Sequence, residues 1–273
     1  MIKSIIVLVL ILLTAITYSQ EKNDSEEEKL ANSIAKESKY YGLIIGINNY
    51  NDDSIPDLVH PIPDAEKLHQ TLTSLYNFED DNTMLLKNPT KADIIYSLDE
   101  IARRITPDDN LLIYFAGHGD FDWDSDKQMG YWLPSNASPD FIDEWISNLE
   151  VVDYLKRIKS RHTLLIVDAG FAGSIFKARS VRENVPLAKE KLFKLPSRKA
   201  MTSGTMTIVP DESVFSKYLI ERLIDNKESV ITSEELFSSL RMAVINNSNV
   251  LPQYGEIRGT GDQGGDLIFL KSK

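Results

Sequence analysis

Two apolar stretches decide the fold: Asn110-Leu-Leu-Ile-Tyr-Phe-Ala116 and, later in the chain, His162-Thr-Leu-Leu-Ile-Val167. Each has the length and continuous apolar character of a strand that is buried on both faces of a parallel sheet. The first runs into Gly117-His118-Gly119, and the second runs into Asp168-Ala169-Gly170. Parallel strands end at one edge of a sheet, where open α/β sheets place their sites. We therefore expect His118 and Gly170 to lie at such a site.

The rest of the chain alternates between strand-like and helix-like segments. Strands separated by helices of this length imply right-handed crossovers and a mostly parallel sheet. The predicted strands are Tyr41–Ile47, Asn82–Lys87, Leu111–Phe115, Thr163–Val167, Arg198–Ser203 and Asp266–Leu270. The predicted helices are Asp64–Tyr76, Ala92–Ile105, Leu149–Ile158, Val214–Asp225 and Ser233–Asn246. Together they predict one α/β domain over residues 40–273.

The order and spacing of short motifs resembles the caspase and metacaspase-like peptidases, the C14 family. The resemblance covers nearly all of Tyr41–Leu270 and includes an interval of about fifty residues between histidine and nucleophile. It implies a three-layer α/β/α sandwich with a mostly parallel central sheet. The motifs are Ile45-Gly-Ile-Asn48, Pro63-Asp-Ala65, Gly117-His-Gly119, Gly130-Tyr-Trp-Leu-Pro134, Thr202-Ser-Gly204, Ser213-Val-Phe-Ser216, Pro252-Gln-Tyr-Gly255 and Gly265-Asp-Leu-Ile-Phe269.

The resemblance also shows what this chain lacks. His118 matches the catalytic base, but the position of the nucleophilic cysteine is occupied by Gly170, and Ala172 replaces the serine usual two positions later. The sequence contains no cysteine, so thiolate catalysis is impossible. Gly119 and Gly170 match positions whose backbone N–H groups hold the oxyanion. Removing a nucleophile typically lowers turnover by a factor of about 10⁶. We therefore interpret the chain as a pseudopeptidase.

Two acidic residues suggest what the site binds. Asp64 and Asp168 match positions that, in metacaspase-like members, lie in a pocket for Arg or Lys side chains, and a guanidinium can pair with carboxylate oxygens. The resemblance thus implies a basic peptide or protein segment as ligand. The alternative is that Asp168 caps the turn after its strand and Asp64 caps the helix beginning at Ala65.

Two rival functions stay open. One is an active hydrolase that uses Ser174, Ser203 or a metal-activated water, and the other is a scaffold or adaptor with a closed cleft. Some metacaspases require calcium, and four carboxylates follow the histidine motif on alternate residues. The EF-hand template fails there because its sixth position is Ser125 and its twelfth is Tyr131, so no cofactor is assigned. The weak calcium candidates are Asp120, Asp122, Asp124 and Asp126.

The N-terminal segment predicts export. Residues 1–19 hold Lys3 and an apolar run of about twelve residues, which is short for a bilayer and typical of a signal peptide. This pattern favours an exported bacterial type, periplasmic or secreted, with no stable membrane span after cleavage. An uncleaved N-terminal anchor is the alternative.

Two further segments have distinctive composition. Residues 20–39 are interpreted as an acidic linker, with a surface helix presenting Leu30, Ile34 and Ala35 as the alternative. Residues 177–199 hold eight Lys or Arg against two acids and match the caspase processing linker. They predict an exposed basic loop, flexible or cleaved.

The net charge of the chain limits which classes of binding partner we expect. The formal charge is −11, which repels phosphate backbones, so we expect no nucleic-acid partner. A chain without cysteine forms no disulfide even in an oxidising compartment, and its stability must come from its core. The remaining candidate partners are a peptide or protein segment, including an active caspase-like relative.

Overall fold

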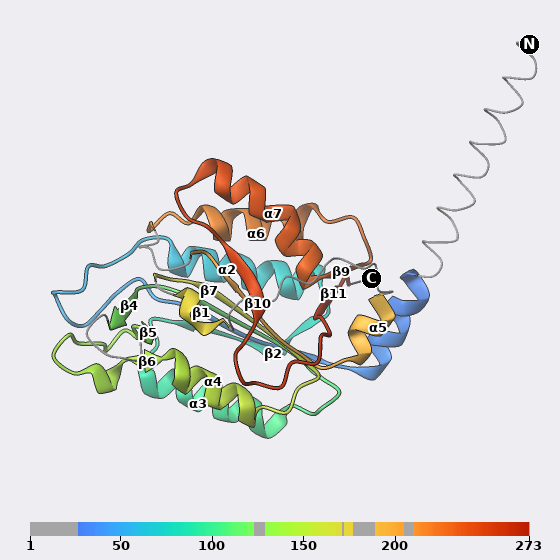
Figure 1. Cartoon of the computed structure of the whole chain (residues 1–273), viewed down its shortest axis with the longest axis horizontal. Coiled ribbons are helices and arrows are strands. Elements are labelled where there is room, and N and C mark those ends of the chain that lie inside the picture. The colour runs from blue at the N-terminus through green and yellow to red at the C-terminus, as the bar shows by residue number, and fades with distance from the viewer. Residues whose placement is uncertain (1–26, 123–128, 171, 177–188, 205–209, 273) are drawn as a thin grey trace, which may run out of the picture.

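The computed structural model describes residues 27–122, 129–170, 172–176, 189–204 and 210–272. Within them, a six-stranded sheet in the order β10-β8-β7-β3-β1-β2 lies between two layers of helices (Figure 1). β10 is antiparallel to β8, and the other neighbouring strands are parallel. The predicted sandwich is confirmed. The strands are β1 (Tyr40–Gly46), β2 (Phe78–Lys87), β3 (Asn110–Ala116), β7 (His162–Asp168), β8 (Ser197–Thr202) and β10 (Gln253–Glu256).

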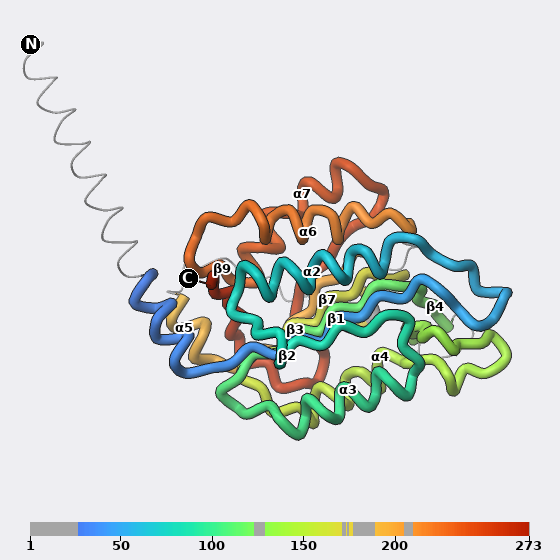
Figure 2. The backbone as a smooth tube through the Cα atoms, turned by 180° about the vertical axis from the view of Figure 1, so that it is seen from behind, coloured from blue at the N-terminus to red at the C-terminus, as the bar shows by residue number. Residues whose placement is uncertain are grey.

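Alternating side chains explain why the central strands are apolar over most of their length. In β3, Leu112 and Tyr114 join the core cluster under α2, α6 and α7, whereas Ile113 and Phe115 join the cluster under α3 and α4. Successive strand residues point to opposite faces, so a sheet with two covered faces needs apolar residues at every position. Figure 2 shows the two helical layers from behind. The helices are α2 (Pro61–Leu75), α3 (Lys91–Arg104), α4 (Asn148–Arg157), α6 (Val214–Asp225) and α7 (Ser233–Asn247).

The register of the three central strands brings their ends together. Gly46 pairs with Ala116, and Ala116 pairs with Asp168. Gly46 also allows α2 to approach closely, because a Cβ built at this position would lie 2.6 Å from the Pro61 carbonyl oxygen. The segments that follow β1, β3 and β7 therefore start at one edge of the sheet.

Two small sheets flank the main one. β4 (Gly119–Asp122), β5 (Met129–Trp132) and β6 (Ile146–Ser147) form an antiparallel sheet directly after the histidine motif, which the sequence pattern did not predict. The predicted last strand is present as β11 (Ile268–Leu270), but it pairs with β9 (Val230–Thr232) outside the main sheet.

The prediction of a linker over residues 20–39 is wrong for residues 27–37, which form a helix. Ile34 is fully buried and Ala31 is 7% exposed, both in the core cluster, whereas Ala35 is exposed. The Lys189 ammonium lies 3.0 Å from the Glu27 carboxylate, and this helix runs beside α5 (Lys189–Lys194) in Figures 1 and 2. A helix is therefore correct here, but Ala31 takes the place predicted for Ala35 on its buried face, and residues 20–26 lie outside the described part.

The prediction of an exposed loop over residues 177–199 is also wrong for its second half. α5 (Lys189–Lys194) buries Phe193, and β8 follows it. The Phe193 carbonyl lies 2.8 Å from Nε2 of His162, and Ser197 Oγ lies 2.8 Å from Nδ1. Burial lowers the pKa of His162 to about 3, so the ring is neutral at physiological pH. Residues 177–188 lie outside the described part.

The described residues contain no helix that is both long and apolar enough to cross a membrane. The predicted signal peptide, residues 1–19, lies outside the described part.

The docked N-terminal helix can be tested by truncating its buried anchor. We expect Ile34→Ala to lower the free energy of unfolding by about 2–5 kcal/mol, because a fully buried side chain is replaced by a cavity. Chemical denaturation measures the change, and Lys36→Ala on the exposed side of the helix should stay within about 0.5 kcal/mol of the natural chain. Equal stability of all three proteins would mean that this helix does not contribute to the core.

Candidate functional site

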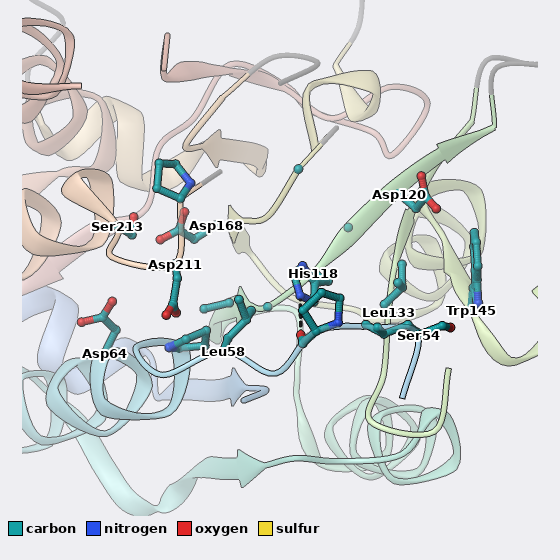
Figure 3. A pocket seen from close by; sticks show the side chains of 18 of the residues that line it. Ser54, Leu58, Asp64, His118, Asp120, Leu133, Trp145, Asp168, Asp211 and Ser213 are labelled. Carbon is teal, nitrogen blue, oxygen red and sulfur yellow. Dashed lines mark hydrogen bonds between the residues drawn. The ribbon is translucent and has the colours of Figure 1, made fainter. Parts of the chain in front are cut away.

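A cleft of about 510 Å³ lies at the carboxyl ends of β1, β3 and β7. Its lining brings together six of the predicted site residues: His118, Gly119, Asp168, Gly170, Asp64 and Asp120. In Figure 3, His118 lies between two groups of side chains. We call the group with Asp64, Asp168 and Asp211 the acidic half.

Backbone and ring contacts fix His118. Its Nε2 lies 2.8 Å from the Pro56 carbonyl oxygen, and its backbone N–H donates to the Tyr50 hydroxyl at 2.7 Å. The Tyr50 ring packs against the imidazole, with the ring centroids 5.0 Å apart. Because a carbonyl only accepts, a neutral His118 in this position carries its proton on Nε2 and keeps Nδ1 as an acceptor. A base oriented by a third group is the arrangement that nucleophilic catalysis uses.

The two glycines predicted to hold an oxyanion touch each other. A Cβ built on Gly119 would lie 2.3 Å from the carbonyl oxygen of Gly170 and 3.3 Å from Cβ of Ala169. Only glycine therefore fits at position 119, next to the site predicted for the nucleophile. The structure thus brings His118, Gly119 and Gly170 into one cleft, while the oxyanion role stays a prediction.

Asp168 ends β7 and is 5% exposed. Its Oδ2 accepts a hydrogen bond from the Ser216 hydroxyl, and that hydroxyl accepts from Tyr114 at 2.7 Å. Burial raises the pKa of Asp168, which the nearby hydroxyls of Ser213, Ser216 and Ser203 partly offset. Within the described residues, Oδ1 is buried without a hydrogen-bond partner. A buried carboxylate oxygen left unpaired is energetically unfavourable, and a donor from a ligand would relieve it.

Asp64 lies in the first turn of α2. Burial and the negative charge of Asp168 raise its pKa to about 6. The prediction that Asp64 caps a helix starting at Ala65 is wrong, because α2 begins four residues earlier at Pro61. The Asn48 side chain accepts from the N–H of Ile62 instead, at 2.8 Å.

The alternative that Asp168 caps the turn after its strand stays a prediction. Its carboxylate accepts a hydrogen bond from Ser216 in the first turn of α6, while the turn that follows β7 lies partly outside the described residues. Both carboxylates line the cleft.

Asp211 is the third residue of the acidic half, and the sequence analysis did not identify it as a site residue. Its carboxylate accepts from the backbone N–H groups of Val59 and His60 at 2.9 and 3.0 Å, and the His60 ring lies 3.4 Å away. Burial alone would raise the pKa of Asp211, but the hydrogen bonds from His60 and Val59 outweigh this effect, so the pKa is lowered. The available signal was its position just before the Ser213-Val-Phe-Ser216 motif.

The remaining sequence candidates are the calcium candidates and the alternative nucleophiles. Asp120 lines the cleft from β4 and Asp122 ends that strand, whereas Asp124 and Asp126 lie outside the described residues. No group of three or more potential metal ligands occurs in the described part of the chain. Among the alternative nucleophiles, Ser203 is fully buried, and the side chain of Ser174 lies outside the described part.

This architecture, with a histidine-bearing cleft at the carboxyl ends of its strands, defines a caspase-like α/β protein. Residues 39–260 match the caspase domain of the peptidase C14 family. The match covers most of the chain, so the chain belongs to this family.

Individual relatives agree with this assignment. Metacaspase-1 from Eremothecium gossypii is 31% identical over 147 residues, which cover 48% of this chain and 31% of that relative. The chain thus matches less than a third of the relative's length. Among solved structures, caspase-1 from Spodoptera frugiperda aligns with a TM-score of 0.59 at 14% identity, over 81% of this chain and 87% of that one. Protein GSU0716 from Geobacter sulfurreducens aligns with a TM-score of 0.57 at 14% identity, over 84% and 99%. These structures share the fold.

The raised pKa of Asp64 predicts a pH-dependent stability difference. A folded-state pKa of about 6, above the ordinary 3.8, means that the folded chain holds this proton more tightly than the unfolded chain, so Asp64 lowers stability as pH rises from about 4 to 6. We expect Asp64→Asn to raise the free energy of unfolding at pH 7 by about 1 kcal/mol, discounted for partial exposure, and to give little gain at pH 4.

Urea denaturation at the two pH values measures this difference. Asp57→Asn is the control of opposite sign, because hydrogen bonds from Tyr50 and Asn49 lower the pKa of Asp57, so its replacement should destabilise the fold at pH 7. A destabilised Asp64→Asn variant at pH 7 would contradict the repulsion inferred in the acidic half.

Proposed function

We propose that this caspase-family chain is a pseudopeptidase that binds a basic peptide or protein segment in its cleft without cleaving it. The observation that carries the proposal is Asp168: a buried carboxylate with one oxygen unpartnered among the described residues, beside Asp64 and Asp211. Charge-bearing groups are rarely buried this way unless a partner neutralises them. Arg or Lys of a ligand supplies that partner.

The charge of the whole cleft agrees with a cationic ligand. Four of its described lining residues are Asp and none is Lys or Arg. A guanidinium offers five N–H donors in a planar fork, which suits carboxylates that converge from different elements. The same lining disfavours an acidic side chain through like-charge repulsion.

The absence of cysteine supports binding without proteolysis. His118 is held by Pro56 and Tyr50 as a base would be, and it shares the cleft with Gly170. In our proposal Gly170 stands at the nucleophile position, so the site retains its base and its acidic half but has no atom to attack a carbonyl. A ligand then occupies the cleft without being acylated.

The N-terminal segment suggests where in the cell this proposed binding takes place. In our proposal residues 1–19 direct export, and the domain acts in the periplasm or outside the cell. A pseudopeptidase there regulates an active caspase-like relative, either by competing for its basic substrates or by binding its basic processing segment.

Ligand preference provides the test. We expect a blocked Ala-Ala-Arg-Ala-Ala peptide to bind at least 10-fold more tightly than the same peptide with citrulline, which keeps the shape of Arg but lacks its charge. Asp168→Asn should remove this preference, because it removes the charge that faces the guanidinium. Calorimetry measures both affinities, and thermal melting checks that the variant is folded.

Glu212→Gln is the matched control, since it removes one exposed negative charge next to Asp211 without touching the cleft lining. This variant should keep the preference for Arg. Equal binding of the Arg and citrulline peptides to the natural chain would contradict the proposal, as would a preference that survives Asp168→Asn.

A further inference from the structure

The cleft continues past His118 into a second half of different chemistry. Most of its lining there is apolar and comes from Ile55, Leu133, Pro139 and Trp145, which we call the apolar half, while Ser54 and Asp120 line the same side. Figure 3 shows Leu133 and Trp145 on the side of His118 opposite to Asp64, Asp168 and Asp211. The proposed contact with a basic side chain uses only the acidic half and leaves the apolar half unexplained.

Hydrogen bonds hold the apolar half in place. The Trp145 indole N–H donates to the Ser138 carbonyl at 2.9 Å, and the Leu133 N–H donates to the His118 carbonyl at 3.1 Å. The loop after β1 is tied to this wall, because Ser138 Oγ donates to Asp52 at 2.8 Å and the Asn51 N–H donates to the Ser135 carbonyl at 2.8 Å. Because this apolar wall is already ordered, a ligand binds it without the entropy cost of ordering a loop.

Polar groups and exposed apolar residues border this wall. Asp120 stands near it, with its Oδ1 accepting from the N–H of Phe121. Phe141 and Ile142 belong to the same 138–145 segment and are 64% and 50% exposed. Exposed apolar residues beside an apolar cleft indicate a surface that a partner covers.

We propose that the apolar half is a subsite for a large apolar side chain, so that the ligand is a peptide segment with a basic residue followed within two residues by an aromatic or large aliphatic one. This inference rests on the proposed binding of a basic side chain in the acidic half, which fixes where the segment starts. The carboxylates of the acidic half select the basic residue of the ligand by charge. The apolar half, which continues the same cleft, selects the apolar residue.

The order of the two residues follows from the place of His118. In a peptidase, a histidine in this position donates a proton to the amine nitrogen of the residue that follows the bound carbonyl. His118 separates the two halves, so the chain that leaves the basic residue toward its C-terminus passes the imidazole and reaches the apolar half. An extended peptide advances about 3.3–3.6 Å per residue, which makes the next two side chains the ones within reach.

A peptide panel tests the subsite. The peptides are blocked at both ends and read Ala-Ala-Arg-X-Y-Ala, with Phe at X or at Y and Ser in the other place, together with a Ser-Ser version and a reversed version that places Phe before Arg. We expect the better of the two Arg-then-Phe peptides to bind the natural chain about 10-fold more tightly than the Ser-Ser peptide, because a Phe side chain leaves water. The reversed peptide should bind no better than the Ser-Ser peptide.

A matched pair of variants locates the effect. Pro139→Lys places a charge in the apolar half, whereas Asp140→Lys places it on the next residue, which is also exposed but does not line the cleft. Pro139→Lys should reduce the ratio of the Phe and Ser-Ser affinities to about one, and Asp140→Lys should preserve it. Comparing ratios within each variant cancels the general electrostatic effect of an added lysine.

The outcomes separate the two proposals. If the Arg peptides bind but Phe gives no advantage, or if Pro139→Lys leaves the advantage intact, the subsite is wrong and the basic pocket stands. If the reversed peptide gains as much as the forward one, the proposed order is wrong. If no Arg peptide binds, both proposals are overturned.

Discussion

A parallel sheet buried on both faces is the constraint on which the rest of this structure depends. Its central strands carry mostly apolar side chains between their ends, so most of their polar groups lie at the strand ends. β1, β3 and β7 end in register at Gly46, Ala116 and Asp168. The fold therefore gathers the polar ends of three strands in one cleft, although they are far apart in the sequence.

Asp168 shows how this constraint produces the proposed binding site at the expense of local stability. As the last residue of a buried strand it is almost completely removed from water, and Ser216 with Tyr114 satisfies only Oδ2. Asp64 adds a second carboxylate whose ionisation the first one opposes. Groups held in unfavourable ionisation states are typical of functional sites, where a ligand supplies the missing partner.

The sequence predicted five of the six strands of the main sheet, its main helices and six residues of the cleft, because these features depend on local patterns, whereas β10 was not predicted. Continuous apolar runs mark buried strands, and Gly119 after His118 reflects a close approach of the backbone that no side chain permits. The predicted capping by Asp64 failed because α2 is capped by Asn48, a residue distant in the sequence. The linker prediction failed because the acidic composition of residues 27–37 outweighed the few apolar positions that dock this helix.

What the sequence could not predict depends on contacts between distant segments. Asp211 enters the acidic half only because the N–H groups of Val59 and His60 hold it there. The apolar half combines Ile55 with residues of the β5–β6 connection, and no pattern along the chain links them. α5 lies in a stretch whose basic composition is typical of a loop, yet Phe193 anchors it against His162.

The central claim is that this cleft is a peptidase cleft that lacks only its nucleophile. Restoring the thiol in Gly170→Cys tests it most directly, with the natural chain and the double variant Gly170→Cys/His118→Ala assayed beside it on fluorogenic Arg, Lys and Asp peptides, with and without calcium. The account predicts cleavage after Arg or Lys by Gly170→Cys alone, and none by the other two proteins. Cleavage by the natural chain, or no cleavage by a folded Gly170→Cys variant, would contradict it.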